Sequence, residues 1–185
     1  MKHYDYTQHV RGESLFVDDI TTPEGTLHAY VFSSPSAHGK IKSIDTSEAL
    51  KQEDIVTIFS AKDIPGQNQI GGIIQDEVLF AEDYVDFIGQ PIAVFIAKNQ
   101  KAAKAASKLI KVDIEKLPVI TDPREAFKRG KLIIPPRVFS CGNLEKAWKE
   151  CDVIVEGEAE SGAQEHIYLE TQGSIALPME GGGIK

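Results

Sequence analysis

The feature that most restricts the fold is a continuous unit between Pro91 and Ile114. Residues 92–97 are apolar at every position, a pattern typical of a central strand that is covered on both faces. Asn99 is a suitable helix cap, and apolar or small residues then recur at helical spacing, at positions 102, 105, 106, 109 and 110. Residues 112–117 alternate between apolar and charged, as in a strand with one wet face. The sequence therefore predicts strand, helix and strand in succession.

Other segments predict further strands and short helices around this unit. Apolar runs between turn signals predict strands over 27–32, 40–45, 55–59, 153–160 and 174–177. Three capping residues, Asp45, Asp122 and Asn143, each precede a short helical pattern. The proline-containing stretch 132–139 reads as an extended connector between two parts of the chain. The pattern as a whole predicts the α+β class.

Composition and charge exclude several classes of function. The 185 residues carry 20 Lys plus Arg against 28 Asp plus Glu, a net charge of −8, which argues against nucleic acid and anionic membranes as partners. No apolar run approaches the roughly 18 residues that cross a bilayer. The first five residues also lack the apolar core of a signal peptide. A cytoplasmic protein is therefore expected.

Most familiar catalytic motifs are missing from the sequence. It contains no glycine-rich dinucleotide or phosphate loop, no zinc-protease helix and no serine elbow. Cys141 and Cys151 are predicted to be reduced thiols without a chemical role. The scattered histidines, His3, His9, His28 and His38, are predicted to be structural or exposed. A hard-cation site at Glu13, Asp18 and Asp19 is a weaker alternative than a solvated turn there.

The segment 161–171 differs from the rest of the chain. Small residues, Gly162 and Ala163, precede the polar triplet Gln-Glu-His, which interrupts what the pattern predicts to be a pair of strands. Buried polar groups cost free energy when unpaired, so partners are expected for them. The small residues would let a bulky ligand approach the backbone, and Gln164 could donate an amide N–H to a metal-bound oxygen. A structural turn remains open as the alternative.

Residues 162–171, Gly-Ala-Gln-Glu-His-Ile-Tyr-Leu-Glu-Thr, resemble the Gly-x-Gln-Glu-His-x-Tyr-Leu-Glu motif of xanthine dehydrogenases and aldehyde oxidases. Four other stretches are similar to the opening of the molybdenum-binding part of that family, at 9–20, 37–45, 76–81 and 85–92. The likeness thus covers nearly the whole chain, and the ordered series is far more specific than any one piece.

The resemblance implies an α/β hammerhead domain over residues 8–120, a connector over 121–142 and the first elements of a molybdopterin-binding domain over 143–185. Such enzymes hydroxylate a purine, aldehyde or N-heterocycle with oxygen from water, and electrons leave through iron–sulfur clusters to FAD. Gln164 matches the family glutamine that lies beside an oxo ligand of molybdenum without binding the metal directly. An uncharged amide suits that position next to a redox metal.

The chain departs from the family pattern because Lys185 precedes the family's general base, substrate-orienting arginine and pterin-binding glycines. The resemblance therefore implies no catalytic residue in this piece, which should be inactive alone. Glu165 and Glu170 are assigned structural or supporting roles. Expected partners are the rest of the molybdenum subunit, iron–sulfur and FAD subunits or domains, a small-molecule substrate and, in the complete enzyme, further copies of itself as a homo-oligomer.

Three readings of function follow from the resemblance. The favoured one is the amino-terminal part of a xanthine dehydrogenase-like oxidoreductase of purine catabolism, because residues 37–45 are especially close to that branch. An aldehyde oxidase-type enzyme is the second reading. The third is a hammerhead module that acts only in protein interactions, which would be compact and monodisperse by itself.

Overall fold

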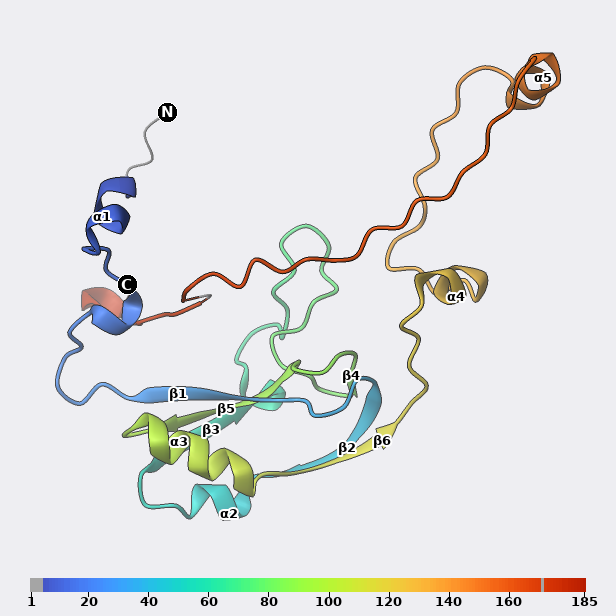
Figure 1. Ribbon diagram of the computed structural model, residues 1–185. Coiled ribbons are helices and arrows are strands. Elements are labelled where there is room, and N and C mark those ends of the chain that lie inside the picture. Colours follow the sequence, from blue (N-terminus) through green and yellow to red (C-terminus); the bar gives the residue numbers. More distant parts are fainter. Residues whose placement is uncertain (1–4, 171) are drawn as a thin grey trace. The chain divides into compact units, whose positions relative to one another are not determined.

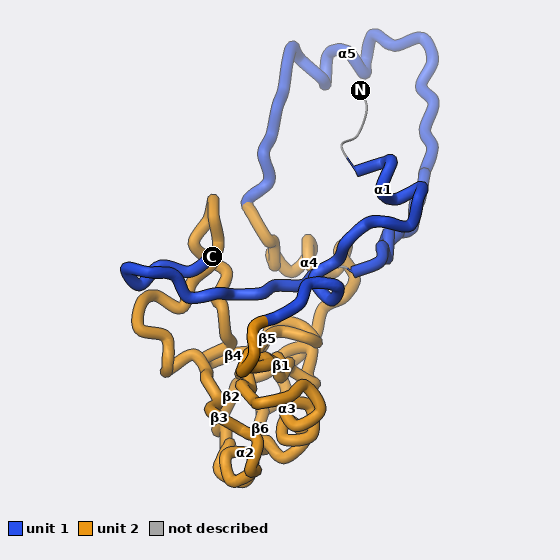
Figure 2. Tube along the Cα trace, turned by 90° about the vertical axis from the view of Figure 1, so that its left-hand side faces the viewer, with its two compact units in different colours: residues 1–22, 135–185 blue, residues 23–134 orange. Residues whose placement is uncertain are grey.

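The computed structural model describes residues 5–170 and 172–185 and divides the chain into two compact units. One unit contains residues 23–134, and the other contains residues 1–22 together with 135–185 (Figure 2). All six strands found among the described residues lie in the first of these units. His3 and Thr171, which took part in the sequence predictions, lie outside the described residues.

The six strands form two three-stranded antiparallel sheets (Figure 1). The first sheet has the order β1-β5-β3 and consists of β1 (His28–Ser33), β5 (Pro91–Ala97) and β3 (Ile55–Ser60). The second has the order β4-β2-β6 and consists of β4 (Tyr84–Val85), β2 (Gly39–Asp45) and β6 (Lys111–Lys116). This mixture of small sheets and short helices confirms the predicted α+β class.

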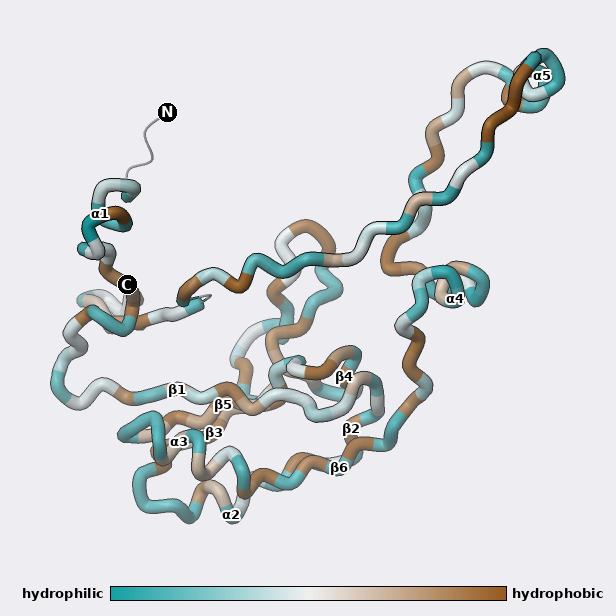
Figure 3. Tube along the Cα trace, viewed as in Figure 1, coloured by the Kyte–Doolittle hydropathy of each residue, from teal (hydrophilic) through white to brown (hydrophobic). Residues whose placement is uncertain are grey.

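Strand β5 is central both to its sheet and to the hydrophobic core. Phe95, fully buried, belongs to a cluster that also includes buried residues of helix α3 (Gln100–Ala106). Ile92, on the opposite face of the strand, is equally buried and belongs to a second cluster together with Val85. The continuous apolar run predicted a strand covered on both faces, and its side chains do enter two separate clusters. Figure 3 shows hydrophobic residues along the strands of this unit.

Helix α3 begins where the sequence predicts and ends earlier. The Asn99 side-chain oxygen accepts a hydrogen bond from the Ala102 N–H at 2.8 Å, as an N-cap should. The α-helix ends at Ala106 and tightens into a 3-10 turn over Ser107–Leu109, although the apolar spacing continues to Ile110. Ile110 is buried, but with extended backbone, so its side chain joins the core from the start of β6 rather than from the helix.

Three other short helices begin at the predicted caps, whereas α1 (Tyr6–Arg11) was not predicted. Asp122 accepts hydrogen bonds from two backbone N–H groups in the first turn of α4 (Pro123–Lys128). Asn143 does the same for one N–H of α5 (Leu144–Glu150). Asp45 accepts from the backbone of the first residue of α2 (Ser47–Leu50), while the N-cap residue itself makes no side-chain capping bond. These ends form as predicted because each capping bond joins residues only two or three positions apart.

Two predicted strands, 153–160 and 174–177, do not form. Both stretches lack regular secondary structure, and Val153 and Val155 are 78% and 87% exposed. A strand is stable only when a neighbouring strand takes up its backbone hydrogen bonds, and the described residues provide no such ladder for either stretch. The isolated bridge between Pro178 and Ile184 is the pairing seen near the carboxyl end of the described chain. Alternating apolar residues were therefore insufficient evidence for a strand here.

Candidate functional site

The segment that carries the polar triplet is extended and open to solvent. Residues 161–169 are all exposed, and Glu170 is half-buried. Ile167 and Glu170 adopt left-handed backbone conformations, with φ of 45° and 51°. Such values are unfavourable for residues other than glycine, and most of all for a β-branched residue such as isoleucine. The expectation that the triplet is buried and paired is wrong, because an exposed polar group has water as its partner.

The side-chain amide of Gln164 has no hydrogen-bond partner among the described residues. Its amide is exposed, and no hydrogen bond joins it to any residue within 5–170 or 172–185. A methyl group added at Gly162 would meet nothing within 4 Å, so the backbone before Gln164 is also accessible. Within the described ranges, the neighbouring Glu165 carboxylate accepts a hydrogen bond only from the backbone N–H of His166, at 3.0 Å. The segment thus presents the uncharged amide donor of Gln164 on an approachable stretch of backbone.

Glu170 makes a contact that sequence reasoning missed. One carboxylate oxygen accepts a hydrogen bond from the backbone N–H of Val17 at 2.7 Å, across 153 residues of chain. Val17 begins a 3-10 turn over Val17–Asp19, and a carboxylate is favourable at such an end because the first N–H groups of a helix have no partner inside it. Both stretches belong to the same unit, residues 1–22 with 135–185. Both stretches are among those that resemble the family, but the resemblance gave no indication that they are in contact.

A hollow of about 730 Å³ lies between these two stretches. Its walls include Phe16, Asp18, Asp19, Tyr168 and Glu170. Asp19 is engaged in the turn, where its carboxylate accepts the Phe16 N–H at 2.9 Å. The described residues contain no group of three or more His, Cys, Asp or Glu side chains that is arranged to hold a metal ion. The weaker alternative of a hard-cation site at Glu13, Asp18 and Asp19 therefore finds no support.

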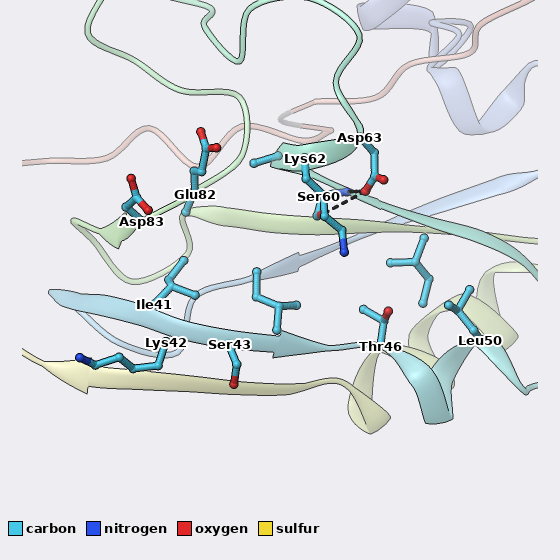
Figure 4. A pocket seen from close by; sticks show the side chains of 14 residues that line it. Ile41, Lys42, Ser43, Thr46, Leu50, Ser60, Lys62, Asp63, Glu82 and Asp83 are labelled. Atoms are coloured by element: carbon cyan, nitrogen blue, oxygen red, sulfur yellow. Dashed lines mark hydrogen bonds between the residues drawn. The ribbon is translucent and has the colours of Figure 1, made fainter.

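A second hollow, of about 510 Å³, lies in the other unit between β2, the end of β3 and the loop 81–83 (Figure 4). Its lining includes the apolar side chains of Ile41 and Leu50 and the carboxylate of Asp63. Asp63 accepts hydrogen bonds from the backbone N–H of Ser60 at 2.8 Å and from its hydroxyl at 2.9 Å. Because both bonds favour the ionised carboxylate, they hold the pKa of Asp63 below the ordinary value of 3.8.

Asp63 should make the unit of residues 23–134 sensitive to acid. A carboxyl group with a lowered pKa in the folded state stabilises that state above its unfolded pKa, and this stabilisation is lost as the pH falls through the folded value. We expect an Asp63→Asn variant to lose less stability than the parent chain between about pH 5 and about pH 2, measured by urea unfolding. Asp83→Asn, on the same hollow, is the control. An identical loss in parent and Asp63→Asn would contradict the assignment.

The mixed sheets and helices of residues 23–134 and the Gln-Glu-His segment are features of one class of protein. Residues 11–118, more than half of the chain, match the aldehyde oxidase and xanthine dehydrogenase a/b hammerhead domain, and residues 128–185 match the molybdopterin cofactor-binding domain. The chain belongs to the aldehyde oxidase and xanthine dehydrogenase family.

Individual relatives agree with this family. Xanthine dehydrogenase from Dictyostelium discoideum is 40% identical over 181 residues, which are 98% of this chain and 13% of that protein. Aldehyde oxidase 2 from Macaca fascicularis is 37% identical over 95% of this chain and 13% of its own length. The solved aldehyde oxidoreductase from Desulfovibrio gigas has a TM-score of 0.62 and 30% identity, and the match covers 66% of this chain and 15% of that one. This chain thus spans only a small part of its relatives.

The residues around Gln164 fit one requirement of a molybdopterin site and leave another unmet. An uncharged amide that no described residue binds, on an accessible backbone, suits hydrogen bonding to an oxo ligand. Enclosure is a separate requirement, because a cofactor site normally buries most of its ligand. Residues 161–169 are all exposed, and of these only residues 167–169 line the hollow of about 730 Å³ described above.

No helix within the described ranges is long and apolar enough to cross a membrane.

Proposed function

We propose that this chain is the amino-terminal part of the molybdenum-binding portion of a hydroxylase that oxidises a purine or a related N-heterocycle. The hammerhead domain is proposed over residues 8–120, a connector over 121–142, and the start of the molybdopterin-binding domain over 143–185. The single observation that carries the proposal is the Gln164 amide of the Gln-Glu-His segment, which is exposed and has no hydrogen-bond partner among residues 5–170 and 172–185. The bound cofactor would supply the oxidation chemistry.

In this proposal the chain contributes one positioned donor, and other residues of the complete protein contribute the walls, the base and the substrate contacts. Gln164 would donate its amide N–H to an oxo ligand of molybdenum without changing the local charge, which matters because a charged neighbour would alter the potential of a redox metal. The exposure of the whole segment 161–169 supports the further proposal that the 185-residue chain is inactive by itself. Iron–sulfur clusters and FAD are proposed on other domains or subunits.

A second candidate is the oxidation of an aldehyde. Its support is the 37% identity to Aldehyde oxidase 2 and the likeness to the Desulfovibrio gigas aldehyde oxidoreductase. We favour a purine because the most similar relatives reported include xanthine dehydrogenases at 40% identity. A cytoplasmic location and a homo-oligomeric complete enzyme belong to the same proposal.

The test compares the complete protein that contains this chain with the 185-residue chain alone. We expect molybdenum in the complete protein and none in the chain, measured by elemental analysis. The complete protein should turn over xanthine faster than an aromatic aldehyde under matched conditions. The opposite order of rates would favour the aldehyde reading. Molybdenum in both proteins, or in neither, would contradict the proposed division of the cofactor site, and its absence from both would favour the interaction module.

A further inference from the structure

We propose that Glu170 is a positioning residue that ties the Gln164 segment to the turn at Val17–Asp19 and so sets where the Gln164 amide is presented. The tie itself is a property of this chain. Its consequence for turnover rests on the proposed function, in which Gln164 faces the cofactor.

The first support is the hydrogen bond from the Val17 N–H to the Glu170 carboxylate. At 2.7 Å it lies at the short end of the range for hydrogen bonds to a charged group, which are stronger than those between neutral groups. Val17 is the first residue of its 3-10 turn, so its N–H has no acceptor within that turn. Both partners are half-buried, which limits competition from water.

The second support is that the segment has no other such link to the described part of the chain. Among residues 5–170 and 172–185, Ser161 and Glu165 form hydrogen bonds only with their immediate neighbours, Gly162 and His166. No backbone hydrogen bond joins this stretch to the rest of the described chain. Glu170 is therefore the point at which the exposed segment is held, six residues after Gln164.

The third support is the backbone at and after Glu170. The left-handed conformation of Glu170 is unfavourable for this residue and persists only where its surroundings impose it. Gly173 packs directly on the same turn: a Cβ added there would lie 3.0 Å from the Cβ of Val17 and 3.3 Å from the Glu170 carboxylate oxygen. A side chain at position 173 would push these groups apart. The absence of a side chain at Gly173 thus leaves room for the hydrogen bond between Val17 and Glu170.

The tie is tested first on the 185-residue chain, by the hydrogen-exchange rate of the Val17 amide in NMR spectra. Glu170→Ala should raise this rate by about tenfold or more, as expected when a hydrogen bond to a charged group is lost. Glu170→Gln keeps an acceptor and should restore much of the protection. Gly173→Ala should also raise the rate, by displacing Val17. Glu165→Ala is the matched control, because its carboxylate bonds only to the next residue. An unchanged Val17 rate in Glu170→Ala would overturn the tie.

The positioning role is tested on the complete protein that contains this chain. Glu170→Ala should lower kcat while molybdenum content and the thermal unfolding midpoint stay close to those of the parent, and Glu170→Gln should recover part of the loss. If Val17 exchange rises in the chain but kcat is unchanged, the tie stands and the positioning role is wrong. If Gln164→Ala also leaves kcat unchanged, the error lies in the proposed function instead.

Discussion

Replacing Gln164 by alanine in the complete protein should lower turnover by about 10- to 100-fold, the usual effect of removing a group that supports a metal's own ligands. In the proposed function the Gln164 amide would donate a hydrogen bond where charge changes during the reaction, and alanine offers no donor. Stability should change little, because Gln164 is exposed and unpaired among the described residues. The measurements are kcat, molybdenum content and the unfolding midpoint.

Gln8→Ala, which removes another exposed glutamine from the same unit, is the matched control and should leave turnover unchanged. Gln164→Glu is a second informative variant, since it keeps the size of the side chain but replaces the donor with an acceptor that carries charge. It should also lower turnover. Parent-like turnover in Gln164→Ala, with molybdenum retained, would remove this residue from the site.

The largest effect on stability is expected from Phe95→Ala. Phe95 is fully buried at the centre of β5, where it packs in the cluster shared with α3. Deleting its ring loses the burial of a large apolar surface and leaves a cavity, which together cost about 3–5 kcal/mol. This is a large part of the total stability of a small domain, about 5–15 kcal/mol. Urea unfolding followed by circular dichroism would measure the change in the free energy of unfolding.

Phe139→Ala makes the same chemical change at a side chain that is 94% exposed. Its free energy of unfolding should stay within about 0.5 kcal/mol of the parent, as is usual for surface positions. A loss below about 1 kcal/mol for Phe95→Ala would mean that β5 does not form the core described above.

The local features of the fold could be predicted well. The cap at Asn99 and those before α4 and α5 appear where the sequence placed them, because each depends on groups within one helical turn. The alternation in β6 was also sufficient, since a strand's two faces follow directly from its period of two residues. The family could be recognised for the same reason, because the resemblance rests on short stretches of neighbouring residues in a fixed order.

Long-range pairing could not be predicted. The strand, helix and strand between Pro91 and Ile114 are consecutive in sequence, yet β5 joins the first sheet and β6 the second. The choice depends on partners far along the chain, β1 and β3 for one and β2 for the other. The prediction of strands at 153–160 and 174–177 was wrong for the same reason. Alternation predicts which residues face each side of a strand, but not whether a neighbouring strand is present to pair with it.

The amino-acid sequence by itself determined most of the helices and strands in residues 23–134, though not the short strand β4. It also determined the caps that begin α3 and α4 and the family that the chain resembles, because these depend on neighbouring residues. Only the tertiary structure decided how the strands divide between two sheets and that Glu170 meets Val17. Such contacts require the chain to close over long distances, 153 residues in the case of Glu170. They depend on the packing of the whole unit, which no local pattern records.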